Sequence, residues 1–383
     1  MNAPGDDESV GFEDLDVAVA HWHVNAWGGA EYLVTKLVEA VEVDRVYTLG
    51  RPDPDDANPY GDATFVDVTP HLDYSAVRRH QRRVGRVFEY AQWEDVNWRK
   101  LGDPDVLITS GTTTRSVITS DDTLHINYCH SPPRWYYDLY HDRKKSLFGT
   151  VTRPLLRYLR TRDTAVDPRV DHYYVNSPIV ERRLWKYYKR SSEILYPPVE
   201  LDRYYDDGDR GFYLHLGRLD EEKGVPAVVG AFEGLDERLV MAGRAGDVDE
   251  SVLERIERAG NIEWHGFVDE GKKFELLARC SAVVFNGRNE DFGIVPIEGN
   301  ASGKPVVSRN DGFPGVFVDD GDNGVLHDGT EHAIKRAIDR VRTMDLSVEP
   351  EAFVSQFSFE TFSRSLREGI KTSYTDFQDR VRQ

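Results

Sequence analysis

The chain of 383 residues contains only two cysteines, Cys129 and Cys280, which lie far apart and outside any CxxC pair. This scarcity excludes a disulfide scaffold and a cysteine-based zinc site, and it suits a reducing cytosol. No apolar run approaches the roughly 18 residues that a membrane-spanning helix needs. The acidic residues 1–14 also lack the apolar segment of a signal peptide. We therefore expect a cytoplasmic protein with a flexible tail over 1–14.

Lysine is scarce as well. The chain has 12 lysines beside 36 arginines, 40 aspartates and 27 glutamates, for a net charge of −19. Surfaces rich in aspartate and poor in lysine are typical of proteins from cells that keep molar salt inside, where screening weakens the self-repulsion. The composition therefore predicts a halophilic protein, with an ordinary acidic protein as the alternative.

Positive charge is concentrated in two stretches of this acidic chain. Residues 78–100 carry a net charge of +4 and residues 142–162 one of +6. Such asymmetry favours an anionic partner. In the second stretch Arg153, Arg157 and Arg160 recur at helical spacing beside Leu155, Leu156 and Leu159, a pattern able to lie on an anionic membrane. Peripheral contact at the inner face of the membrane is thus one expectation, and two solvated helix faces are the other. The acidic balance and the lack of a reader motif argue against nucleic acid.

Short apolar runs of strand length alternate with segments of helical periodicity along most of the chain, which predicts parallel α/β sheets. The predicted strands cover 16–24, 45–49, 63–68, 105–110, 123–129, 171–177, 211–217, 238–243, 261–266, 281–286 and 304–308. Pro197-Pro198 resembles a linker between two such series. We expect an N-terminal Rossmann-like domain over 1–198, a second over 199–358, and a C-terminal helix over 359–383. Two unrelated Rossmann domains in tandem would give a similar pattern.

The most specific motif is Glu290-Asp-Phe-Gly-Ile-Val-Pro-Ile-Glu298. Its spacing places Glu290 in a loop and Glu298 in the first turns of a helix, at the carboxyl edge where open α/β sheets bind ligands. Carboxylates accept hydrogen bonds from vicinal hydroxyls, as sugars and riboses require. Gly293, between Phe292 and Ile294, permits close approach of the backbone, and the helix N-terminus favours phosphate.

A second motif, Gly217-Arg218-Leu-Asp-Glu-Glu-Lys223-Gly224, follows directly after a strand. Arg218 and Lys223 lie five residues apart on a loop that enters a helix, and together they could hold one diphosphate. Ion pairing of these cations with neighbouring acids is the alternative interpretation. We expect no metal and no cofactor, since no third ligand stands at a metal-binding spacing beside His21 and His23.

Three further features come from the N-terminal half. Gly28-Gly29 follow the first strand, where a ligand can approach backbone that lacks a Cβ; a simple tight turn is the alternative. His21 and His23 in that strand are expected to be core or wall residues. The segment NYCHSPPRWYYD ends a strand at His130. After it come Arg134, Trp135 and Tyr136, which could line an acceptor site because aromatic rings stack on sugar faces.

Taken together, these motifs resemble those of the retaining glycosyltransferase family 4, and the resemblance covers about residues 16–375. It implies a GT-B fold, in which two Rossmann-like domains face a cleft and a C-terminal helix returns to the first domain. By the EX7E match, Glu290 would hold donor-sugar hydroxyls and Glu298 the ribose, with Phe292, Gly293 and Ile294 beside them. Arg218 and Lys223 would bind the pyrophosphate, His130 would face the donor sugar, and Gly28-Gly29 would form the N-terminal glycine loop.

The implied activity is metal-independent transfer of a hexose, mannose or glucose, from a nucleotide sugar to a glycan or lipid-linked acceptor. GDP-mannose is the first candidate donor and UDP-glucose the second. The sequence departs from the family pattern at three places: Asn286-Gly287-Arg288-Asn289 replaces the usual small residue, Gly299 replaces alanine, and the segment 311–315 lacks an acid at the family's downstream position. A nucleotide-sugar epimerase of the same fold and a catalytically silent nucleotide-sugar-binding subunit remain as alternatives.

Overall fold

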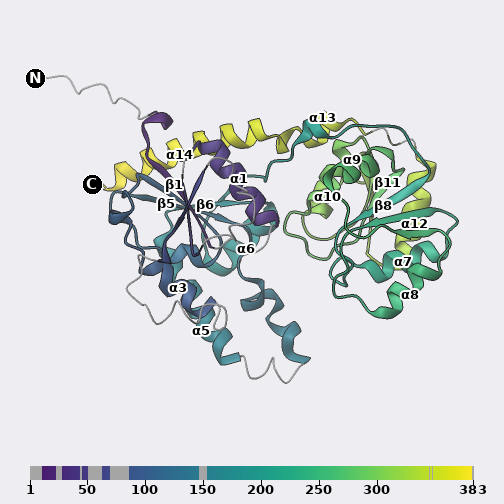
Figure 1. Cartoon of the computed structure of the whole chain (residues 1–383), viewed down its shortest axis with the longest axis horizontal. Coiled ribbons are helices and arrows are strands. Elements are labelled where there is room, and N and C mark those ends of the chain that lie inside the picture. The colour runs from purple at the N-terminus through teal and green to yellow at the C-terminus, as the bar shows by residue number, and fades with distance from the viewer. Residues whose placement is uncertain are drawn as a thin grey trace, which may run out of the picture. The chain divides into compact units, whose positions relative to one another are not determined.

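The computed structural model describes residues 11–22, 28–43, 45–50, 63–69, 86–145, 153–344, 346 and 348–381. The chain divides into two compact units, one of Met1–Pro198 with Phe359–Gln383 and one of Val199–Ser358. Each unit has a parallel β-sheet with helices packed around it (Figure 1). We describe the two units separately.

The first unit has a seven-stranded parallel sheet with the order β3-β2-β1-β4-β5-β6-β7. Strand order reverses direction between β1 and β4, which are neighbours in register from Val17 beside Val106 to His21 beside Ser110. The strands are β1 Val17–His21, β2 Arg45–Thr48, β3 Thr64–Asp67, β4 Val106–Ser110, β5 Leu124–Cys129, β6 His172–Val175 and β7 Glu193–Ile194. Every residue of β4 and β5 is buried, as expected for central strands covered on both faces.

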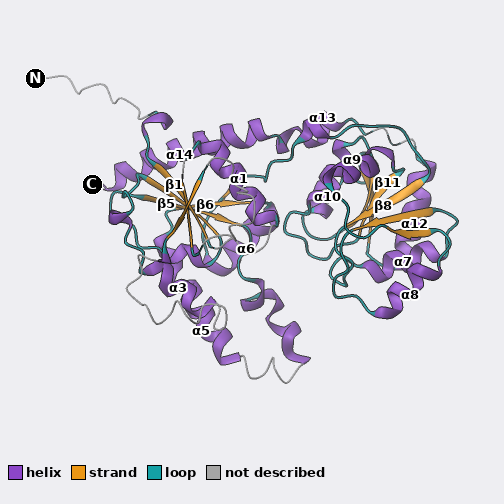
Figure 2. Ribbon diagram, in the orientation of Figure 1, coloured by secondary structure: helices purple, strands orange, loops and turns teal. Residues whose placement is uncertain are grey.

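Helices surround this sheet (Figure 2). The α-helices are α1 Gly29–Val41, α3 Arg86–Glu94, α5 Arg153–Val166, α6 Pro178–Tyr188 and α14 Phe359–Val381. The 3-10 helices are Phe12–Asp14, Trp98–Lys100, Thr113–Ser116, Arg134–Tyr136, Asp138–Lys145 and Asp167–Arg169. Helix α6 shows why such elements begin where they do. Pro178 is its first residue, and the Ser177 hydroxyl caps the helix by accepting a hydrogen bond from the Val180 amide at 3.3 Å.

The C-terminal helix α14 packs on the first unit although it follows the second in sequence. Phe362, Leu366 and Ile370 recur at helical spacing and are buried in the same core cluster as Leu33 and Leu37 of α1. Burying three such side chains contributes about 1.5–3 kcal/mol each. The C-terminal segment is therefore an integral part of the first unit.

Part of the expected flexible tail is ordered. Residues 1–10 lie outside the described ranges, but Phe12–Asp14 form a 3-10 helix. Phe12 packs against the core, and the Arg367 guanidinium lies 5.1 Å from the centre of its ring. An aromatic ring thus packs the end of the predicted tail against the first unit.

The second unit has a six-stranded parallel sheet with the order β10-β9-β8-β11-β12-β13. Its strands are β8 Phe212–Leu216, β9 Arg238–Ala242, β10 Ile262–Trp264, β11 Ala282–Phe285, β12 Val306–Arg309 and β13 Gly324–His327. Its α-helices are α7 Val225–Glu233, α8 Glu250–Arg258, α9 Glu270–Arg279, α10 Ile294–Ala301, α11 Pro314–Phe317, α12 Glu331–Thr343 and α13 Pro350–Val354, with 3-10 helices at Leu201–Arg203 and Ser355–Phe357. Separate apolar clusters cover the two faces of the sheet.

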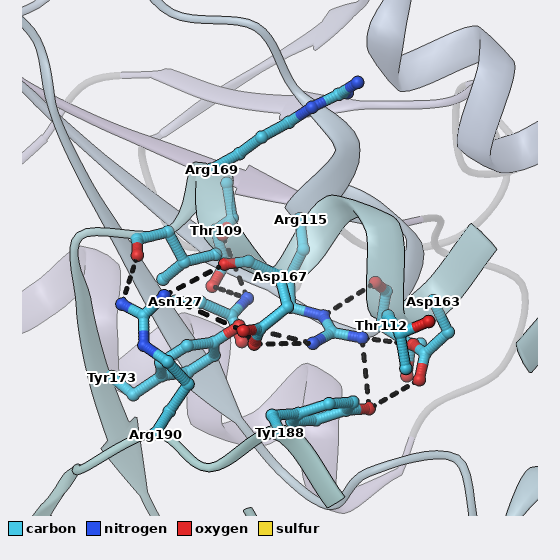
Figure 3. A network of polar contacts seen from close by, with 12 residues as sticks. Thr109, Thr112, Arg115, Asn127, Asp163, Asp167, Arg169, Tyr173, Tyr188 and Arg190 are labelled. Carbon is cyan, nitrogen blue, oxygen red and sulfur yellow. Dashed lines mark hydrogen bonds and ion pairs between the residues drawn. The ribbon is translucent and has the colours of Figure 1, made fainter. Parts of the chain in front are cut away.

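A buried polar network lies beside the sheet of the first unit (Figure 3). Its centre is an ion pair between Arg115 and Asp163, whose side chains are 1% and 0% exposed. The Asp163 carboxylate also accepts hydrogen bonds at 2.7 Å from the hydroxyls of Tyr137 and Tyr188. Because these partners satisfy both charges, the pair is tolerated in the interior, whereas either charge alone would be costly. The network ties α5 and α6 to the turn that follows β4.

Candidate functional site

Strand order in the second unit reverses between β8 and β11, and both predicted ligand-binding motifs follow these two strands. Gly217 and Arg218 come directly after β8, while Asn286 comes directly after β11. In open α/β sheets, ligands bind at the carboxyl ends of the strands that flank such a switch point. The fold therefore brings two motifs about 70 residues apart in sequence to one edge of the sheet.

The first loop presents two cations in different states. The Arg218 side chain is 64% exposed, and its guanidinium lies 3.3 Å from the carboxylate of Asp220. Asp220 is itself buried and accepts a hydrogen bond from the Lys223 amide at 2.8 Å, which closes the loop. Lys223 instead points its Nζ to Glu290, 2.5 Å from Oε1. One predicted phosphate-binding cation is thus open to solvent, and the other is held by the predicted sugar-binding acid.

Further contacts hold the two loops together. The Asn286 side-chain amide donates to the Gly224 carbonyl at 3.0 Å, and the Arg288 amide donates to the Glu222 carbonyl at 2.9 Å. Asn286 is 1% exposed. Asn286 belongs to the segment that departs from the family pattern, and the structure accounts for its presence. Its side chain fixes the loop that carries Lys223 against the loop that carries Glu290.

Two glycines in these loops have no substitute. Gly224 has a φ of 65°, and a Cβ there would lie 2.6 Å from the Asn286 carbonyl oxygen. Gly293 has a φ of 68° and caps α10, and a Cβ there would lie 2.7 Å from Pro314. Both require the left-handed conformation and close approach that glycine alone permits without strain. Gly293 leaves the first amides of α10 at the same edge as Glu290, where they can favour a phosphate.

Glu298 is buried at 4% exposure, one turn into α10. Its Oε1 accepts a hydrogen bond from the Tyr204 hydroxyl at 2.8 Å and from the Lys273 ammonium at 3.0 Å. Burial lowers the pKa of Lys273, but Glu298 and Glu270 more than offset this, and the net pKa is raised. Glu298 is therefore held in place by two partners that the local motif does not contain.

Residues 291–295 after the first glutamate are half-buried, and Pro296 and Ile297 are buried. Phe292 stacks on Phe313 with ring centres 5.4 Å apart and meets Phe357 edge to face at 5.8 Å. Ile294 is the first residue of α10. The aromatic cluster gives the loop after Glu290 a rigid base.

A second polar cluster lies at the switch point of the first unit. His21 and Ser110 end the neighbouring strands β1 and β4, and His130 follows β5. The Ser110 Oγ lies 3.1 Å from His21 Nδ1 and 2.8 Å from His130 Nε2. On the other side, His21 Nε2 lies 3.7 Å from the carboxylate of Glu31 in α1. The predicted residue His130 is thus the outer end of a chain of four polar groups.

The environment of this cluster sets its protonation. Burial, with a smaller contribution from His21, lowers the pKa of His130 to about 3, so the imidazole is neutral near pH 7. Burial raises the pKa of Glu31, but its interaction with His21 outweighs this and lowers the net value. Gly28 caps α1 beside this acid, and a Cβ on Gly28 would lie 3.1 Å from a Glu31 carboxylate oxygen. Gly29 has open space where its Cβ would be, and His23 lies outside the described residues.

The three predicted acceptor residues occupy different environments. Trp135 is 37% exposed, and Arg134 pairs with Asp138 at 3.1 Å. Tyr136, by contrast, is 2% exposed and packs with Leu156 and Leu159. A ring at this depth cannot stack on a sugar, so the structure argues against Tyr136 as an acceptor contact and leaves Trp135 as the accessible aromatic side chain.

The amphipathic pattern of 153–160 is also oriented differently from the membrane prediction. Leu156 and Leu159 are buried in the protein core, and Arg160 donates to the Tyr136 carbonyl at 2.6 Å. Only Leu155, at 43%, remains exposed among the three leucines. The apolar stripe of α5 is therefore mainly a core-facing stripe. Arg78, Arg79, Arg82 and Arg83 of the other basic stretch lie outside the described residues.

Membrane spans and metal clusters are both absent from the described ranges. No helix there is both long and apolar enough to cross a membrane. Within the same part of the chain, no three histidine, cysteine or acidic side chains gather in a way that could hold a metal ion.

Sequence reasoning missed several residues of these clusters, namely Glu31, Ser110, Tyr204, Lys273 and the bridging role of Asn286. Tyr204 and Glu298 are 94 residues apart, and His21 and Ser110 are 89 apart. The tertiary fold brings such pairs together, and for His21 and Ser110 it does so through the pairing of β1 with β4. A strand-ending serine or histidine is a weak signal for this, since the carboxyl ends of neighbouring parallel strands meet at one edge.

Comparison with known proteins identifies part of the chain. Residues 203–351 match the family model of glycosyl transferases group 1. An uncharacterized glycosyltransferase of Methanocaldococcus jannaschii, MJ1178, is 29% identical over 156 residues, which are 39% of this chain and 43% of that protein. The human alpha-1,3/1,6-mannosyltransferase ALG2 is 25% identical over 280 residues, 60% of this chain and 65% of that one. The chain thus matches less than two thirds of the length of these relatives.

Solved structures match over nearly the whole chain. Anabaena HepE, solved in complex with UDP, superposes with a TM-score of 0.69 at 14% identity and covers 94% of this chain and 100% of that one. At this identity the likeness establishes the fold alone. The chain has the GT-B fold, with two parallel-sheet α/β domains and a C-terminal helix, which confirms the predicted fold class.

Proposed function

We propose that this protein is a retaining glycosyltransferase that moves a hexose from a nucleotide sugar to a glycan or lipid-linked acceptor. The proposal rests mainly on one edge of the second sheet, where the loops with Arg218, Lys223 and Glu290 meet beside the N-terminus of α10. Cations and helix amides suit a diphosphate, and a carboxylate suits sugar hydroxyls. The match to glycosyl transferases group 1 covers this same region.

In this proposal the leaving group determines the chemistry. Breaking the anomeric C–O bond places negative charge on the departing diphosphate, and Arg218 with Lys223 would stabilise that charge. Glu290 would hold the donor sugar and Glu298 the ribose. A retaining course in which the leaving phosphate deprotonates the acceptor hydroxyl is what the family resemblance implies. It needs neither a protein nucleophile nor a metal or other cofactor.

Mannose from GDP-mannose is the first candidate donor and glucose from UDP-glucose the second. Support for mannose comes from the mannosyltransferase ALG2, and support for glucose from HepE structures that contain UDP-glucose. A thermal-shift panel of nucleotide sugars in high salt tests the proposal. A stabilisation by one nucleotide sugar over its free nucleotide supports it, and no shift with any of them counts against it.

Two alternative functions, a silent binding subunit and an epimerase, can be distinguished from a glycosyltransferase by assays in solution. A silent binding subunit would be stabilised by the nucleotide sugar but would release no nucleotide, whereas an enzyme would hydrolyse the donor slowly. An epimerase would convert the donor sugar without any acceptor. A glycosyltransferase would release nucleotide faster when a glycan or lipid-linked acceptor is added.

Membrane contact is the finer part of the proposal, and it depends on the exposed side of α5. Arg157 is exposed there beside Leu155 and Tyr158, which are 43% and 50% exposed. Anionic liposomes should co-sediment the protein at low salt, and a variant with Arg157→Gln and Leu155→Ser should bind less. Arg258→Gln, an exposed position of the second unit, is the matched control. Absence of the wild type from every pellet would favour a soluble acceptor.

A further inference from the structure

The four polar groups at the switch point of the first unit lie in a row, of which Glu31, His21 and Ser110 are buried and His130 is partly buried. In order they are Glu31, His21, Ser110 and His130, with successive separations of 3.7, 3.1 and 2.8 Å. His21 and Ser110 are 0% exposed and lie side by side because β1 and β4 pair in parallel with these residues in register. The His130 carbonyl accepts a hydrogen bond from the Asn176 amide at 3.1 Å, so its backbone is fixed as well. The register of β1 and β4 therefore fixes the relative positions of His21 and Ser110.

The residue types invite comparison with a hydrolytic triad, but the geometry excludes that role. A nucleophilic serine must be accessible to its substrate, and the Ser110 side chain has no exposed surface. Its oxygen also lies between two imidazoles, within hydrogen-bond distance of both. The serine therefore connects the two histidines and is not a nucleophile.

A serine hydroxyl between two ring nitrogens fixes the direction of hydrogen-bond donation along this row of groups. The hydroxyl has a single proton, so it donates to one histidine and accepts from the other. Glu31 lies 3.7 Å from His21 Nε2, which places the proton of a neutral His21 on that nitrogen and leaves Nδ1 to accept the serine proton. The serine oxygen in turn accepts a proton from His130 Nε2. This order leaves the Nδ1 atom of His130 unprotonated.

We infer that Glu31, His21 and Ser110 are positioning residues that hold His130 as the Nε2–H tautomer and present its Nδ1 atom as a hydrogen-bond acceptor to a substrate hydroxyl. Within the described part of the chain, no side chain or backbone group bonds to this Nδ1 atom. The tautomer assignment uses only contacts within the first unit. Its purpose, to accept a hydrogen bond from a sugar hydroxyl, rests on the proposed function.

The direct test is nitrogen NMR of the full-length protein with ¹⁵N-labelled histidine rings, in which two-bond couplings report the tautomer of each imidazole. His130→Asn assigns the His130 signals. We expect a protonated Nε2 and a bare Nδ1 at His130 in the wild type. Ser110→Ala should convert His130 to a mixture of tautomers, and Ser116→Ala, which removes another fully buried hydroxyl, should leave it unchanged. A protonated Nδ1 in the wild type, or no change in Ser110→Ala, would overturn the inference.

Kinetics then test whether the tautomer of His130 matters for turnover, with hydrolysis of GDP-mannose and UDP-glucose as the probe reactions. Ser110→Ala should lower kcat/KM about tenfold, which is the loss of one hydrogen bond of ordinary strength. Ser110→Thr, which keeps the hydroxyl, should restore both the tautomer and most of the rate. A changed tautomer with an unchanged rate would confirm that Ser110 sets the tautomer of His130, and would show that His130 does not contact the substrate. A wild type that turns over neither probe would count against the proposed function, while the NMR result would still decide the tautomer.

Discussion

Lys223 and Glu290 are in direct contact, with the ammonium nitrogen 2.5 Å from Oε1 of the carboxylate. Both side chains are about one fifth exposed, at 23% and 20%, so the pair faces the edge of the sheet that a ligand can reach. The two groups assigned to opposite ends of a bound sugar diphosphate thus satisfy each other in the free protein. A diphosphate that binds here must compete with Glu290 for Lys223.

Diphosphate binding should depend on both cations of the first loop. Arg218→Ala and Lys223→Ala should each lose roughly 1.5–3 kcal/mol of binding free energy, or about 10- to 150-fold in affinity, for GDP or UDP in calorimetry. Arg238→Ala is the control, because Arg238 begins β9, at the amino end of the sheet, and its exposed guanidinium pairs with Glu263 of β10. Equal affinity in the wild type and both loop variants would refute the assignment.

The buried network of the first unit should be important for stability. Asp163→Ala leaves the fully buried Arg115 charge without its main partner, which should destabilise the unit by about 3–5 kcal/mol. Tryptophan fluorescence during urea unfolding reports this unit, since six of the seven tryptophans lie in residues 1–198. Glu360→Ala breaks an ion pair with Arg364 in the same unit, whose side chains are 56–88% exposed, and should cost less than about 1 kcal/mol. Similar losses for the two variants would contradict the role given to Asp163.

Stability should fall on acidification because of buried neutral histidines. Burial lowers the pKa of His125 from 6.5 to about 4, so between these values the unfolded chain binds more protons than the folded one. The free energy of unfolding therefore rises with pH across this window, by about 2 kcal/mol per such histidine between pH 5 and 7. His125→Gln should flatten the pH dependence of the fluorescence-detected transition. An equally steep curve in the variant would show that His125 is not responsible.

The acidic composition makes a separate prediction about salt. With a net charge of −19, the melting temperature should rise steeply from dilute to molar potassium chloride as the repulsion is screened. Sodium chloride at equal ionic strength should act similarly if screening is the cause. A flat or falling curve in calorimetry would identify an ordinary acidic protein.

Local sequence patterns were enough to predict the architecture. All eleven predicted strands occur, because most of them are short apolar runs buried in a parallel sheet. The two strands that were missed are β7, which has two residues, and β13, a four-residue strand that begins with Gly324. Strand β7 is too short to show a pattern, and in β13 only Val325 and Leu326 are apolar, between Gly324 and His327.

The sites were predictable only as far as their signals are local. Arg218 with Lys223, and Glu290 with Glu298, stand within single loops or loop–helix junctions, so their spacing in the sequence already indicates a common purpose. Lys273 and Ser110 have no such neighbour, since their partners come from other strands and helices. A different limit applies to Leu156 and Leu159, which are buried in the protein core. A helical stripe of leucines indicates an amphipathic helix, but the sequence alone does not say whether a membrane or a protein core covers that stripe.

The central claim is that Glu290 holds the donor sugar while Lys223 and Arg218 hold its diphosphate, and the most direct measurement is the turnover of Glu290→Gln with the nucleotide sugar that the thermal-shift panel selects. The variant should lose about 100-fold in kcat/KM, the value of one charged hydrogen bond. It should also bind the free nucleoside diphosphate at least as tightly as the wild type, because Lys223 is released from its ion pair. Near-normal turnover in Glu290→Gln, with diphosphate affinity unchanged, would contradict the account.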